Sequence, residues 1–366
     1  MNNQRLLEAV RVIDLSQYIP GPFATRQLAD LGAEVIKIEP PGGDPMRRFM
    51  YQDSSQPSPV YRHINRGKRV CELDLKSDSG KQALGELIEG ADILLESFRP
   101  GALARLGFDR EHLDKLNPRL VHCALSGYGQ NGPYAQRAGH DINYCALASQ
   151  SIVSGSEQTP VIGFPPIADH ASALQASTAM LAALHARNNN GRGVYIDVSM
   201  SESILAWQYL PLLTGATERA SSLLNGGAAC YNIYRCADGN FVSLGAIEPV
   251  FWKNFCNALN RPDWVKRQYE TMPQAGLLDE VAAVIAKNPL DHWRGLLDDI
   301  DCCFEALFDP EELAHQPQFQ FRQSLTDAGP TYPAWIDGQA IRTDTDFEQM
   351  QDNKAPRWTT ERSHRS

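Results

Sequence analysis

The chain has little of what marks several large classes of protein. Its 34 Lys and Arg are outnumbered by 44 Asp and Glu, a formal net charge of −10, so nucleic-acid binding through clustered cations is not expected. No run approaches the roughly 18 apolar residues of a membrane span, so no membrane contact is predicted. The eight cysteines form no C-x-x-C pair and no metal-finger spacing, and no signal peptide precedes them. Reduced thiols, no metal and a cytoplasmic location are therefore expected.

The common nucleotide-binding and catalytic motifs are also missing. There is no G-x-x-x-x-G-K-[ST], no H-E-x-x-H and no G-x-S-x-G. The segment SQYIPGPFATRQLADLG (16–32) joins two strand-like segments as in a dinucleotide-binding unit, but it lacks G-x-G-x-x-G. Pro20 and Pro22 also remove backbone donors where a pyrophosphate would need them. Nicotinamide or flavin binding by this turn is not expected, and no resident cofactor is predicted.

What is present is an alternation of strand-like and helix-like segments. Hydrophobic residues make up 43% of the 366 residues, which is typical of a folded chain with about two domains. Alternation of this kind predicts an α/β fold with a Rossmann-like, mostly parallel sheet covered by helices on both faces. The predicted strands are 10–16, 33–39, 92–97, 119–127 and 194–200, and the predicted helices are 21–32, 77–91, 101–116 and 171–187.

The pattern changes after about residue 210. Residues 231–249 read as two strands around Asp238–Gly239, a strong hairpin signal, and helices are expected at 250–260 and 277–300. These features predict a large Rossmann-like domain from 1–210 with 325–366 and a small α+β domain from 211–324. The last residues, APRWTTERSHRS (355–366), are expected to form a loose tail.

Seven ordered blocks resemble the class III CoA-transferase family. The blocks are VRVIDLSQYIPGPFATRQLADLGAEVIKIEPPGGDPMRR, NRGKRVCELDLKSDSGK, LLESFRPGALARLGFD, LNPRLVHCALSGYGQNGPY, AGHDINY, PPIADHASAL and GRGVYIDVSMSESIL. The resemblance is close over 8–210 and looser over 231–315. It implies acyl-CoA chemistry, with coenzyme A as part of the substrate, on an interlocked homodimer. The family includes formyl-CoA transferase, carnitine CoA-transferase and α-methylacyl-CoA racemase.

Two chemistries occur within this family. Its transferases use an aspartate, matched by Asp169, that attacks an acyl-CoA thioester and passes through an aspartyl-CoA thioester. Its racemases pair the same aspartate with a histidine, matched by His140, and GAIEP resembles the segment that supports this histidine, which points to Glu248. The glycine-rich loop of formyl-CoA transferase is missing near Glu248, which favours the racemase branch. IADHAS lacks the glycines that usually follow the racemase aspartate, so the transferase and a catalytically silent CoA-binding protein stay open.

The chemistry gives its own reason for such a set of residues. A thioester α-proton is weakly acidic, so its transfer needs a base on one face of the planar enolate and an acid on the other. His140 suits the base because imidazole titrates near neutrality. Asp169 would act as the acid if burial raised its pKa. Glu248 behind the imidazole would fix its tautomer, and backbone N–H groups after Asp141 are candidates for the enolate oxygen.

Each of these residues also has a purely structural interpretation. Asp169 stands just before the predicted helix 171–187, where an aspartate is a common N-cap. Asp141 is expected to cap the helix that it precedes. Gly139, two residues earlier, is expected to give the loop the conformational freedom that places His140. Glu248 before Pro249 could be an exposed acid in a first helical turn. His140 by itself could be an ordinary loop histidine.

Coenzyme A carries phosphates, so a few cations must be concentrated in this acidic chain. The resemblance assigns Leu73 and Lys76 to the adenine and ribose wall and Arg99 to a phosphate. It assigns the backbone of Tyr18, Ile19 and Pro20 to the adenosine pocket. Further candidates are Arg47 and Arg48 for phosphate and Tyr128, between two glycines, for the thioester. Pro40 stands where formyl-CoA transferase has an arginine, and a solvated surface charge is the alternative for every cation.

Overall fold

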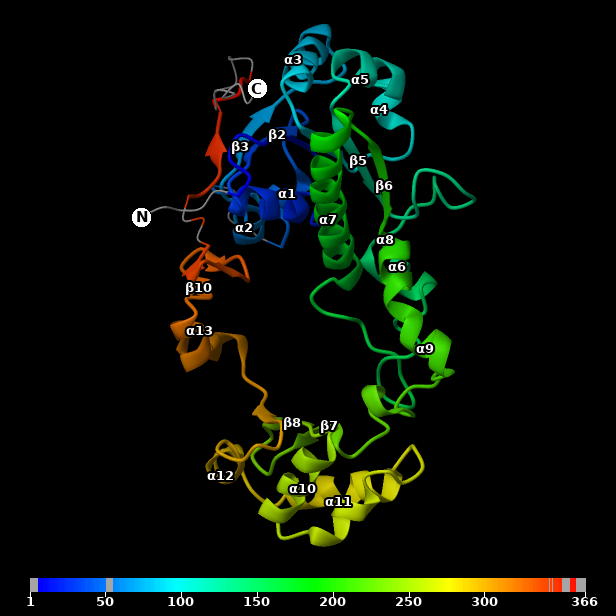
Figure 1. Cartoon of the computed structure of the whole chain (residues 1–366), viewed down its shortest axis with the longest axis vertical. Coiled ribbons are helices and arrows are strands. Elements are labelled where there is room, and N and C mark those ends of the chain that lie inside the picture. The colour runs from blue at the N-terminus through cyan, green and yellow to red at the C-terminus, as the bar shows by residue number, and fades with distance from the viewer. Residues whose placement is uncertain (1–5, 51–54, 342, 344, 351–355, 360–366) are drawn as a thin grey trace. The chain divides into compact units, whose positions relative to one another are not determined.

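The computed structural model of the chain describes residues 6–50, 55–341, 343, 345–350 and 356–359 (Figure 1). Two compact units are formed. Unit 1 comprises residues 1–148, 164–206 and 316–366, and unit 2 comprises residues 149–163 and 207–315. Relative to the boundaries expected from the sequence, residues 149–163 and 207–210 group with the smaller unit and residues 316–324 with the larger one. Among the described helices, none combines the length and apolarity that crossing a bilayer demands.

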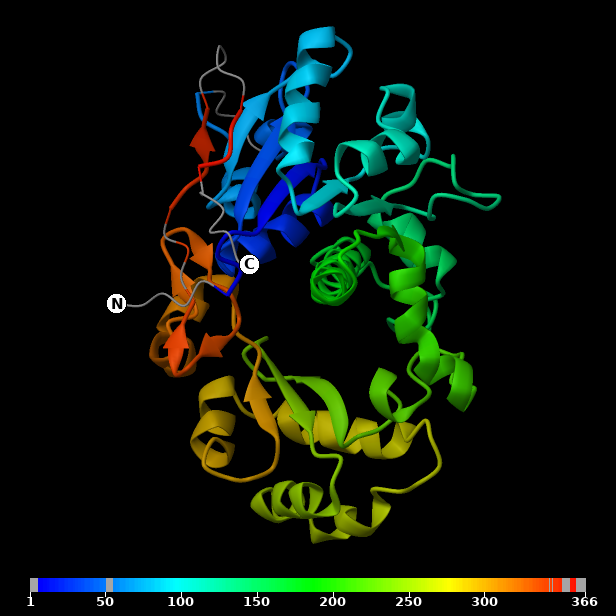
Figure 2. The same ribbon diagram turned by 45° about the horizontal axis from the view of Figure 1, so that its top comes forward.

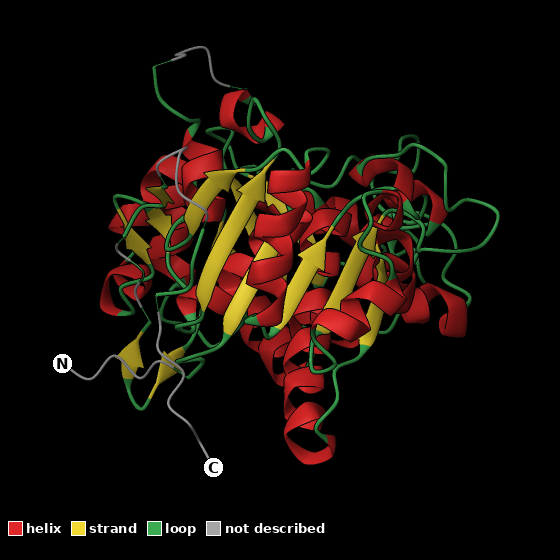
Figure 3. Cartoon of the chain, turned by 90° about the horizontal axis from the view of Figure 1, so that it is seen from above, coloured by secondary structure: helices red, strands yellow, loops and turns green. Residues whose placement is uncertain are grey.

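Unit 1 is built on a seven-stranded sheet in the order β14-β3-β2-β1-β4-β5-β6, and every neighbouring pair is parallel. Figure 3 shows its strands between helices on both faces. The strands are β1 (Arg11–Leu15), β2 (Glu34–Glu39), β3 (Arg69–Glu72), β4 (Ile93–Glu96), β5 (Val121–Ser126), β6 (Tyr195–Ser199) and β14 (Glu348–Gln349). Consecutive strands leave β1 in opposite directions, so β1 and β4 flank the point where the strand order reverses. The predicted Rossmann-like fold is confirmed.

Helices cover both faces of this sheet because apolar strand residues point to both sides. One face packs on α1 and α7 with Val12, Val35 and Val121, and the other packs on α3 and α5 with Ile13 and Ile36. The helices of unit 1 are α1 (Pro20–Asp30), α2 (Pro59–Asn65), α3 (Asp78–Glu89), α4 (Ala102–Arg105), α5 (Arg110–Leu116), α6 (Asp141–Leu147), α7 (Ile167–Asn190), α8 (Met200–Leu205) and α13 (Pro317–Phe321), with the 3₁₀ turn η1 (Pro45–Arg48). The 3₁₀ turn η2 (Ala206–Gln208) spans the boundary between the units. Short hairpins pair β10 (Leu325–Thr326) with β11 (Gly329–Pro330) and β12 (Trp335–Ile336) with β13 (Gln339–Ala340).

Unit 2 contains the predicted hairpin. Strands β7 and β8 pair antiparallel around Asp238–Gly239, β9 adds a third strand, and the hairpin lies against α11 (Figure 2). The core of the unit includes the fully buried Trp252 and Trp264. The elements are β7 (Tyr231–Arg235), β8 (Phe241–Gly245), β9 (Phe304–Ala306), α9 (Tyr209–Thr214), α10 (Pro249–Ala258), α11 (Ala275–Ile285), α12 (Leu290–Leu297), η3 (Leu223–Asn225), η4 (Pro262–Arg267) and η5 (Pro310–His315).

Three predicted elements differ in the structure. The helix expected over 101–116 is divided into α4 and α5, because Gly107 adopts φ of +100° between them. The helix expected over 277–300 is divided into α11 and α12, and Pro289 stands at the start of the second. Part of the expected loose tail is docked, since the indole N–H of Trp358 donates to the Leu87 carbonyl at 3.2 Å. Residues 355 and 360–366 of that tail lie outside the described residues.

Candidate active site

A cavity of about 410 Å³ opens at the carboxyl ends of the parallel strands in unit 1. Leu15 and Glu39 end β1 and β2, Leu73 follows β3, and Phe98 follows β4. Ligands of open parallel sheets bind at this edge, beside the point where the strand order reverses. The cavity is lined by Leu15, Gln17, Ile38, Glu39, Pro40, Pro41, Leu73, Asp74, Leu75, Lys76, Phe98 and Leu106.

Two of the residues predicted to bind coenzyme A, Leu73 and Lys76, line this cavity. Lys76 is the one cation among the described residues of its wall. Arg99 is exposed and directly follows Phe98, so it stands next to the cavity without lining it. Pro40, at the position that carries an arginine in formyl-CoA transferase, lines the wall and adds no charge.

The backbone segment predicted to line the adenosine pocket lies beside the cavity. Gln17 reaches the wall, whereas Tyr18, Ile19 and Pro20 do not. Ile19 packs against the buried cluster around Met46, and Pro20 begins α1 with its ring buried. Contact of coenzyme A with these three residues stays a prediction.

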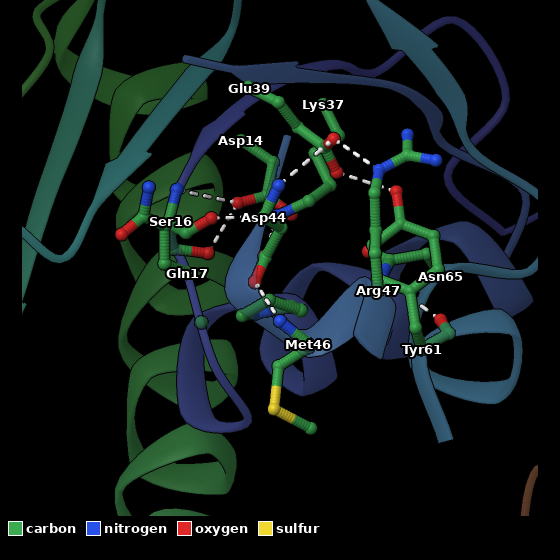
Figure 4. A network of polar contacts seen from close by, with 12 residues as sticks. Asp14, Ser16, Gln17, Lys37, Glu39, Asp44, Met46, Arg47, Tyr61 and Asn65 are labelled. Carbon is green, nitrogen blue, oxygen red and sulfur yellow. Dashed lines mark hydrogen bonds and ion pairs between the residues drawn. The ribbon is translucent and has the colours of Figure 1, made fainter. Parts of the chain in front are cut away.

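Arg47 contacts Glu39 and Tyr61 at this edge of the sheet, and its predicted contact with a phosphate stays a prediction. Its Nε lies 2.6 Å from Glu39 Oε2, and its guanidinium stands 4.6 Å from the centre of the Tyr61 ring. The Tyr61 hydroxyl donates to the other oxygen of Glu39 at 2.5 Å. Figure 4 shows Arg47, Glu39 and Tyr61 pointing toward one another. Arg48 is exposed.

Buried charges hold the loop between β1 and α1. Lys37 and Asp14 are 0% exposed and Lys68 is 1% exposed. Lys37 Nζ donates to the Ser16 carbonyl at 2.7 Å, and Lys68 Nζ donates to the Pro22 carbonyl at 2.8 Å and to Asp14 at 3.0 Å. Burial raises the pKa of Asp14, but the two ammonium groups outweigh it and hold that pKa well below its usual range. The carbonyls at the two ends of the loop are therefore held by the buried ammonium groups of Lys37 in β2 and of Lys68 just before β3.

The start of α7 carries Asp169, the predicted catalytic aspartate. Helix α7 begins at Ile167, so Asp169 is its third residue, and the interpretation as N-cap is wrong. The helix is capped from a distance instead. Asp141 Oδ1 accepts the N–H of Ala168 at 2.6 Å and the N–H of Asp169 at 3.2 Å.

This geometry also corrects the predicted role of Asp141. Asp141 is the first residue of α6, and its carboxylate caps α7 rather than the helix that it begins. The N-cap of α6 is His140, whose own N–H is accepted by the side-chain oxygen of Asn143 at 3.0 Å. The turn that carries His140 is thereby joined through Asp141 to the turn that carries Asp169.

Asp169 has the electrostatics of a group that can both give and take a proton. Its burial, and then the negative charge of Asp141, raise the pKa of Asp169 to about 7. At neutral pH its protonated and ionised forms are therefore present in similar amounts. A carboxyl group tuned in this way suits general acid–base catalysis and is typical of functional sites.

His140 is exposed, and its ring meets the edge of the Tyr18 ring with centroids 6.0 Å apart. A glycine is required at position 139 because neighbouring side chains approach its Cα closely, and not because the loop needs conformational freedom. A Cβ at Gly139 would lie 2.8 Å from the Tyr128 hydroxyl and 2.9 Å from the Tyr144 ring. Tyr144 also donates its hydroxyl to the Gly139 carbonyl at 2.5 Å. Tyr128, predicted to approach the thioester, thus packs beside the turn of His140.

Glu248 belongs to unit 2, whereas His140 and Asp169 belong to unit 1. It is the exposed N-cap residue of α10, directly before Pro249. Burial and the Glu248 charge raise the pKa of the neighbouring Cys303 thiol. The predicted support of His140 by Glu248 stays a prediction.

Of the two residues that organise this corner, the sequence singled out Asp141, as the cap of another helix, and did not single out Tyr144. Asp141 and Tyr144 stand three positions apart and so share one face of α6, a spacing that the sequence displays. Their partners in α7 and at Gly139 depend on the fold. Among the described residues, no group of three or more His, Cys, Asp or Glu is placed to hold a metal ion.

Comparisons with known proteins find similar sequences and a similar fold. A model described as "CoA-transferase family III" matches residues 7–358. The alpha-methylacyl-CoA racemase of Homo sapiens is 34% identical over 327 residues, covering 87% of this chain and 82% of that protein. The succinyl-CoA–D-citramalate CoA-transferase of Chloroflexus aurantiacus is 33% identical over 337 residues, covering 88% and 83%. A crystal structure of a CAIB/BAIF family protein from Brucella suis has a TM-score of 0.81 at 23% identity, covering 94% of this chain and 96% of that one.

Proposed function

The chain belongs to CoA-transferase family III, and from that premise we propose that it racemises 2-methylacyl-CoA thioesters by moving the α-proton through an enolate. The observation that carries the proposal is the joined pair of turns at α6 and α7. The carboxylate of Asp141 accepts the N–H of Asp169, whose pKa is raised to about 7, and His140 directly precedes Asp141 in the chain. The racemase among the relatives supports this chemistry over simple thioester binding.

In the proposed reaction His140 removes the α-proton from one face of the thioester. The C–H electron pair moves into the thioester as an enolate, and His140 becomes an imidazolium. Protonated Asp169 then delivers a proton to the opposite face of the α-carbon, which inverts the configuration. The reverse direction exchanges the two roles. A carboxyl with an ordinary pKa near 4 would hold almost no proton at neutral pH, so the raised pKa of Asp169 is what makes this step efficient.

The substrate's coenzyme A moiety is proposed to bind at the carboxyl edge of the sheet. Leu73 and Lys76 form the wall for the adenosine in the cavity of about 410 Å³. Arg99 reaches a phosphate from beside the cavity, and the backbone of Tyr18, Ile19 and Pro20 borders the nucleotide. Tyr128 lies close to the thioester, beside the turn of His140. Glu248 supports the imidazole of His140 in this proposal.

A CoA-transferase is the second candidate, because succinyl-CoA–D-citramalate CoA-transferase is also a relative at similar identity. Ionised Asp169 would attack the thioester carbonyl, release CoA thiolate and form a mixed anhydride. The thiolate would then attack the aspartyl carbonyl, which releases the first carboxylate and leaves an aspartyl-CoA thioester for an acceptor acid. IADHAS, without the glycines of the racemases, favours this route.

Incubation of the protein with 2-methylbutanoyl-CoA in deuterated water separates these reactions. The racemase incorporates deuterium at the α-carbon without any acceptor acid. The transferase shows no exchange, moves CoA to an added carboxylate, and yields a hydroxylamine adduct at Asp169. Binding of the thioester without either reaction would identify a silent binding protein and contradict both candidates.

Two variants sharpen the comparison. In the racemase, His140→Ala lowers the racemisation rate by at least roughly 100-fold, because removal of a general base costs about that much or more. In the transferase, the same variant leaves transfer largely intact. His185→Ala is the matched control, because His185 is an exposed histidine in the distal part of α7. Its exchange rate stays within about twofold of the wild type, as is typical of surface substitutions.

A further inference from the structure

The peptide unit that precedes His140 is held at both of its polar groups. It comprises the Gly139 carbonyl and the His140 N–H, which belong to one planar group. The Tyr144 hydroxyl donates to that carbonyl at 2.5 Å, and the side-chain oxygen of Asn143 accepts that N–H at 3.0 Å. Two neighbouring residues in the first turn of α6 therefore fix the plane of this peptide unit.

The same two residues also hold the peptide unit that follows His140. The His140 carbonyl accepts the backbone N–H of Asn143 at 2.8 Å and that of Tyr144 at 3.3 Å. His140 is the N-cap residue of α6, with extended φ and ψ of −129° and 176°. Because both planes that meet at its Cα are fixed, the direction of the Cα–Cβ bond that carries the imidazole is fixed as well.

The Tyr144 hydroxyl reaches the carbonyl through a slot between two glycines. Tyr144 is 6% exposed. A Cβ at Gly127 would lie 2.5 Å from its hydroxyl, and a Cβ at Gly139 would lie 2.9 Å from its ring. Gly127 directly follows β5, and its carbonyl accepts the Ser201 N–H at 3.1 Å. One side of the slot is therefore anchored to the sheet, which sets the position of the hydroxyl together with α6.

The Tyr144 hydroxyl keeps its proton throughout the pH range of the proposed reaction. Burial, and then the nearby Tyr128, Asp169 and Asp141, raise the pKa of this phenol to about 12. A neutral phenol has one proton to donate, and a carbonyl oxygen only accepts. The Gly139 carbonyl therefore stays held while Asp169 gains and loses its own proton.

Capping of α6 accounts for only one of these contacts. A capping box joins the N–H of the N-cap residue to the side chain three positions later, which is the bond from His140 to Asn143. The Tyr144 hydroxyl has a different partner, because its acceptor lies two residues before the helix begins. This hydrogen bond therefore stabilises the turn that carries His140 rather than the end of the helix.

We propose that Asn143 and Tyr144 are positioning residues that direct the imidazole of His140 at the α-carbon of the thioester, a role that rests on the proposed function, in which His140 is the base. Both residues act through the peptide units of His140 and need no contact with the substrate. Displacement of a reacting group by about 1 Å can lower a rate by about 100-fold. A peptide unit that is free to turn would therefore slow proton transfer without weakening thioester binding.

Hydrogen exchange of the His140 amide proton tests this role without the catalysed reaction. In protein with labelled histidine, His140→Ala identifies this signal among those of the nine histidines. Tyr144→Phe, and Asn143→Ala at an exposed residue, are each expected to speed its exchange at least tenfold. Tyr234→Phe is the matched control and should leave it unchanged, because this 4% exposed tyrosine donates its hydroxyl to the Ala229 carbonyl in unit 2 at 2.7 Å. Unchanged exchange in Tyr144→Phe would overturn the proposal, and Asn143→Ala decides it if that variant does not fold.

The kinetics of racemisation test the consequence for the reaction. Tyr144→Phe is expected to lower kcat at least tenfold and to leave KM within about twofold, whereas Tyr234→Phe changes neither by more than about twofold. In a His140→Ala background, Tyr144→Phe is expected to change the residual rate by less than twofold, because no imidazole is left to position. An equal loss in both backgrounds would overturn the proposal. A reaction that survives His140→Ala would instead contradict the proposed function, and amide exchange would still show whether Tyr144 holds the turn.

Discussion

At the scale of single residues, one carboxylate tunes another. The negative charge of Asp141 has two tasks. Its carboxylate accepts the N–H groups of Ala168 and Asp169 and so caps α7, and its charge adds to the burial that raises the pKa of Asp169. The same residue precedes Asn143, which fixes the N–H of His140. The backbone N–H groups of His140 and Asp169, the proposed base and acid, are therefore both held by side chains of α6.

Asp141→Asn is expected to separate these two tasks. The amide keeps an oxygen for the N–H groups of α7 but removes the negative charge, so the pKa of Asp169 falls from about 7 toward its ordinary value. The limb of the pH–rate profile that reports Asp169 should move to lower pH, while thermal unfolding changes little. An unmoved limb would show that burial alone sets the pKa of Asp169. Exchange in deuterated water between pH 5 and 9 measures the profile.

Buried His122 makes the folded chain less stable as pH falls. The pKa of His122 is about 4 in the folded chain and near 6.5 when unfolded, so the unfolded state takes up a proton first as pH falls. Its contribution to stability is therefore lost below about pH 6.5. Glu96 and Asp169, with raised pKa values, have the opposite effect, so only a variant isolates the histidine.

His122→Leu is expected to remove this acid sensitivity. Between pH 7 and pH 5 the wild type should lose roughly 1 to 2 kcal/mol of unfolding free energy relative to the variant, at about 1.4 kcal/mol per unit of pKa. Urea unfolding at the two pH values measures the difference. Parallel losses in the two proteins would mean that the pKa of His122 is not lowered in the folded chain.

At the scale of elements, the loop from Ser16 to Pro22 owes its position to charges beneath it. Lys37 and Lys68 reach the carbonyls at its two ends from β2 and from the chain before β3. Within the loop, Tyr18 adopts φ of +63°, a conformation that an ordinary residue keeps only when its surroundings enforce it. The ring of Tyr18 meets His140, so the buried charges also bear on the catalytic corner.

Lys37→Met is expected to destabilise unit 1 strongly. It leaves the carboxylate of Asp44, which stands 3.0 Å from the Lys37 ammonium, buried without that partner. Breaking such a pair from one side costs about 3 to 5 kcal/mol. Lys115→Met, which removes a highly exposed ion pair on α5, should cost less than about 1 kcal/mol. Urea unfolding compares the two variants, and equal small losses would show that water reaches Asp44.

At the scale of the whole molecule, we propose the interlocked homodimer that the family resemblance implies. Each unit shows large apolar side chains that a stable surface rarely leaves open. In unit 1, Phe164 is 93% exposed, and in unit 2, Leu212 and Leu213 of α9 are 69% and 82% exposed. In the dimer, a second chain would cover these side chains, which would explain why they are apolar.

If the dimer forms, its mass and its rate of subunit exchange can be predicted. Sedimentation equilibrium should give about 81 kDa, twice the 40.6 kDa of one chain. Differently tagged dimers, once mixed, should form no hybrid over days, because linked chains part only by unfolding. Refolding the mixture from urea should give hybrids at about half of the total. Rapid exchange without urea would show a dimer whose chains are not linked, and a mass of one chain would contradict the dimer itself.

Local patterns determined most of the secondary structure. Runs such as 10–16 and 33–39 became β1 and β2 because apolar β-branched residues suit a strand buried on both faces. The hairpin at Asp238–Gly239 formed because an Asp-Gly pair readily adopts the backbone conformation of a tight turn. Helix breaks at Gly107 and Pro289 were missed, although both residues disfavour helix, because the apolar periodicity runs on through them.

The sequence by itself determined five of the seven strands of the large sheet, the main helices, the family and the identity of His140 and Asp169 as candidates, because these follow from neighbours in the chain and from ordered motifs. It did not show the short strands β3 and β14 at one edge of the sheet. Only the tertiary structure decided that Asp141 caps α7 from 27 residues away and that Asp169 titrates near neutrality. Burial and charge proximity set both results, and they exist only after distant segments have come together.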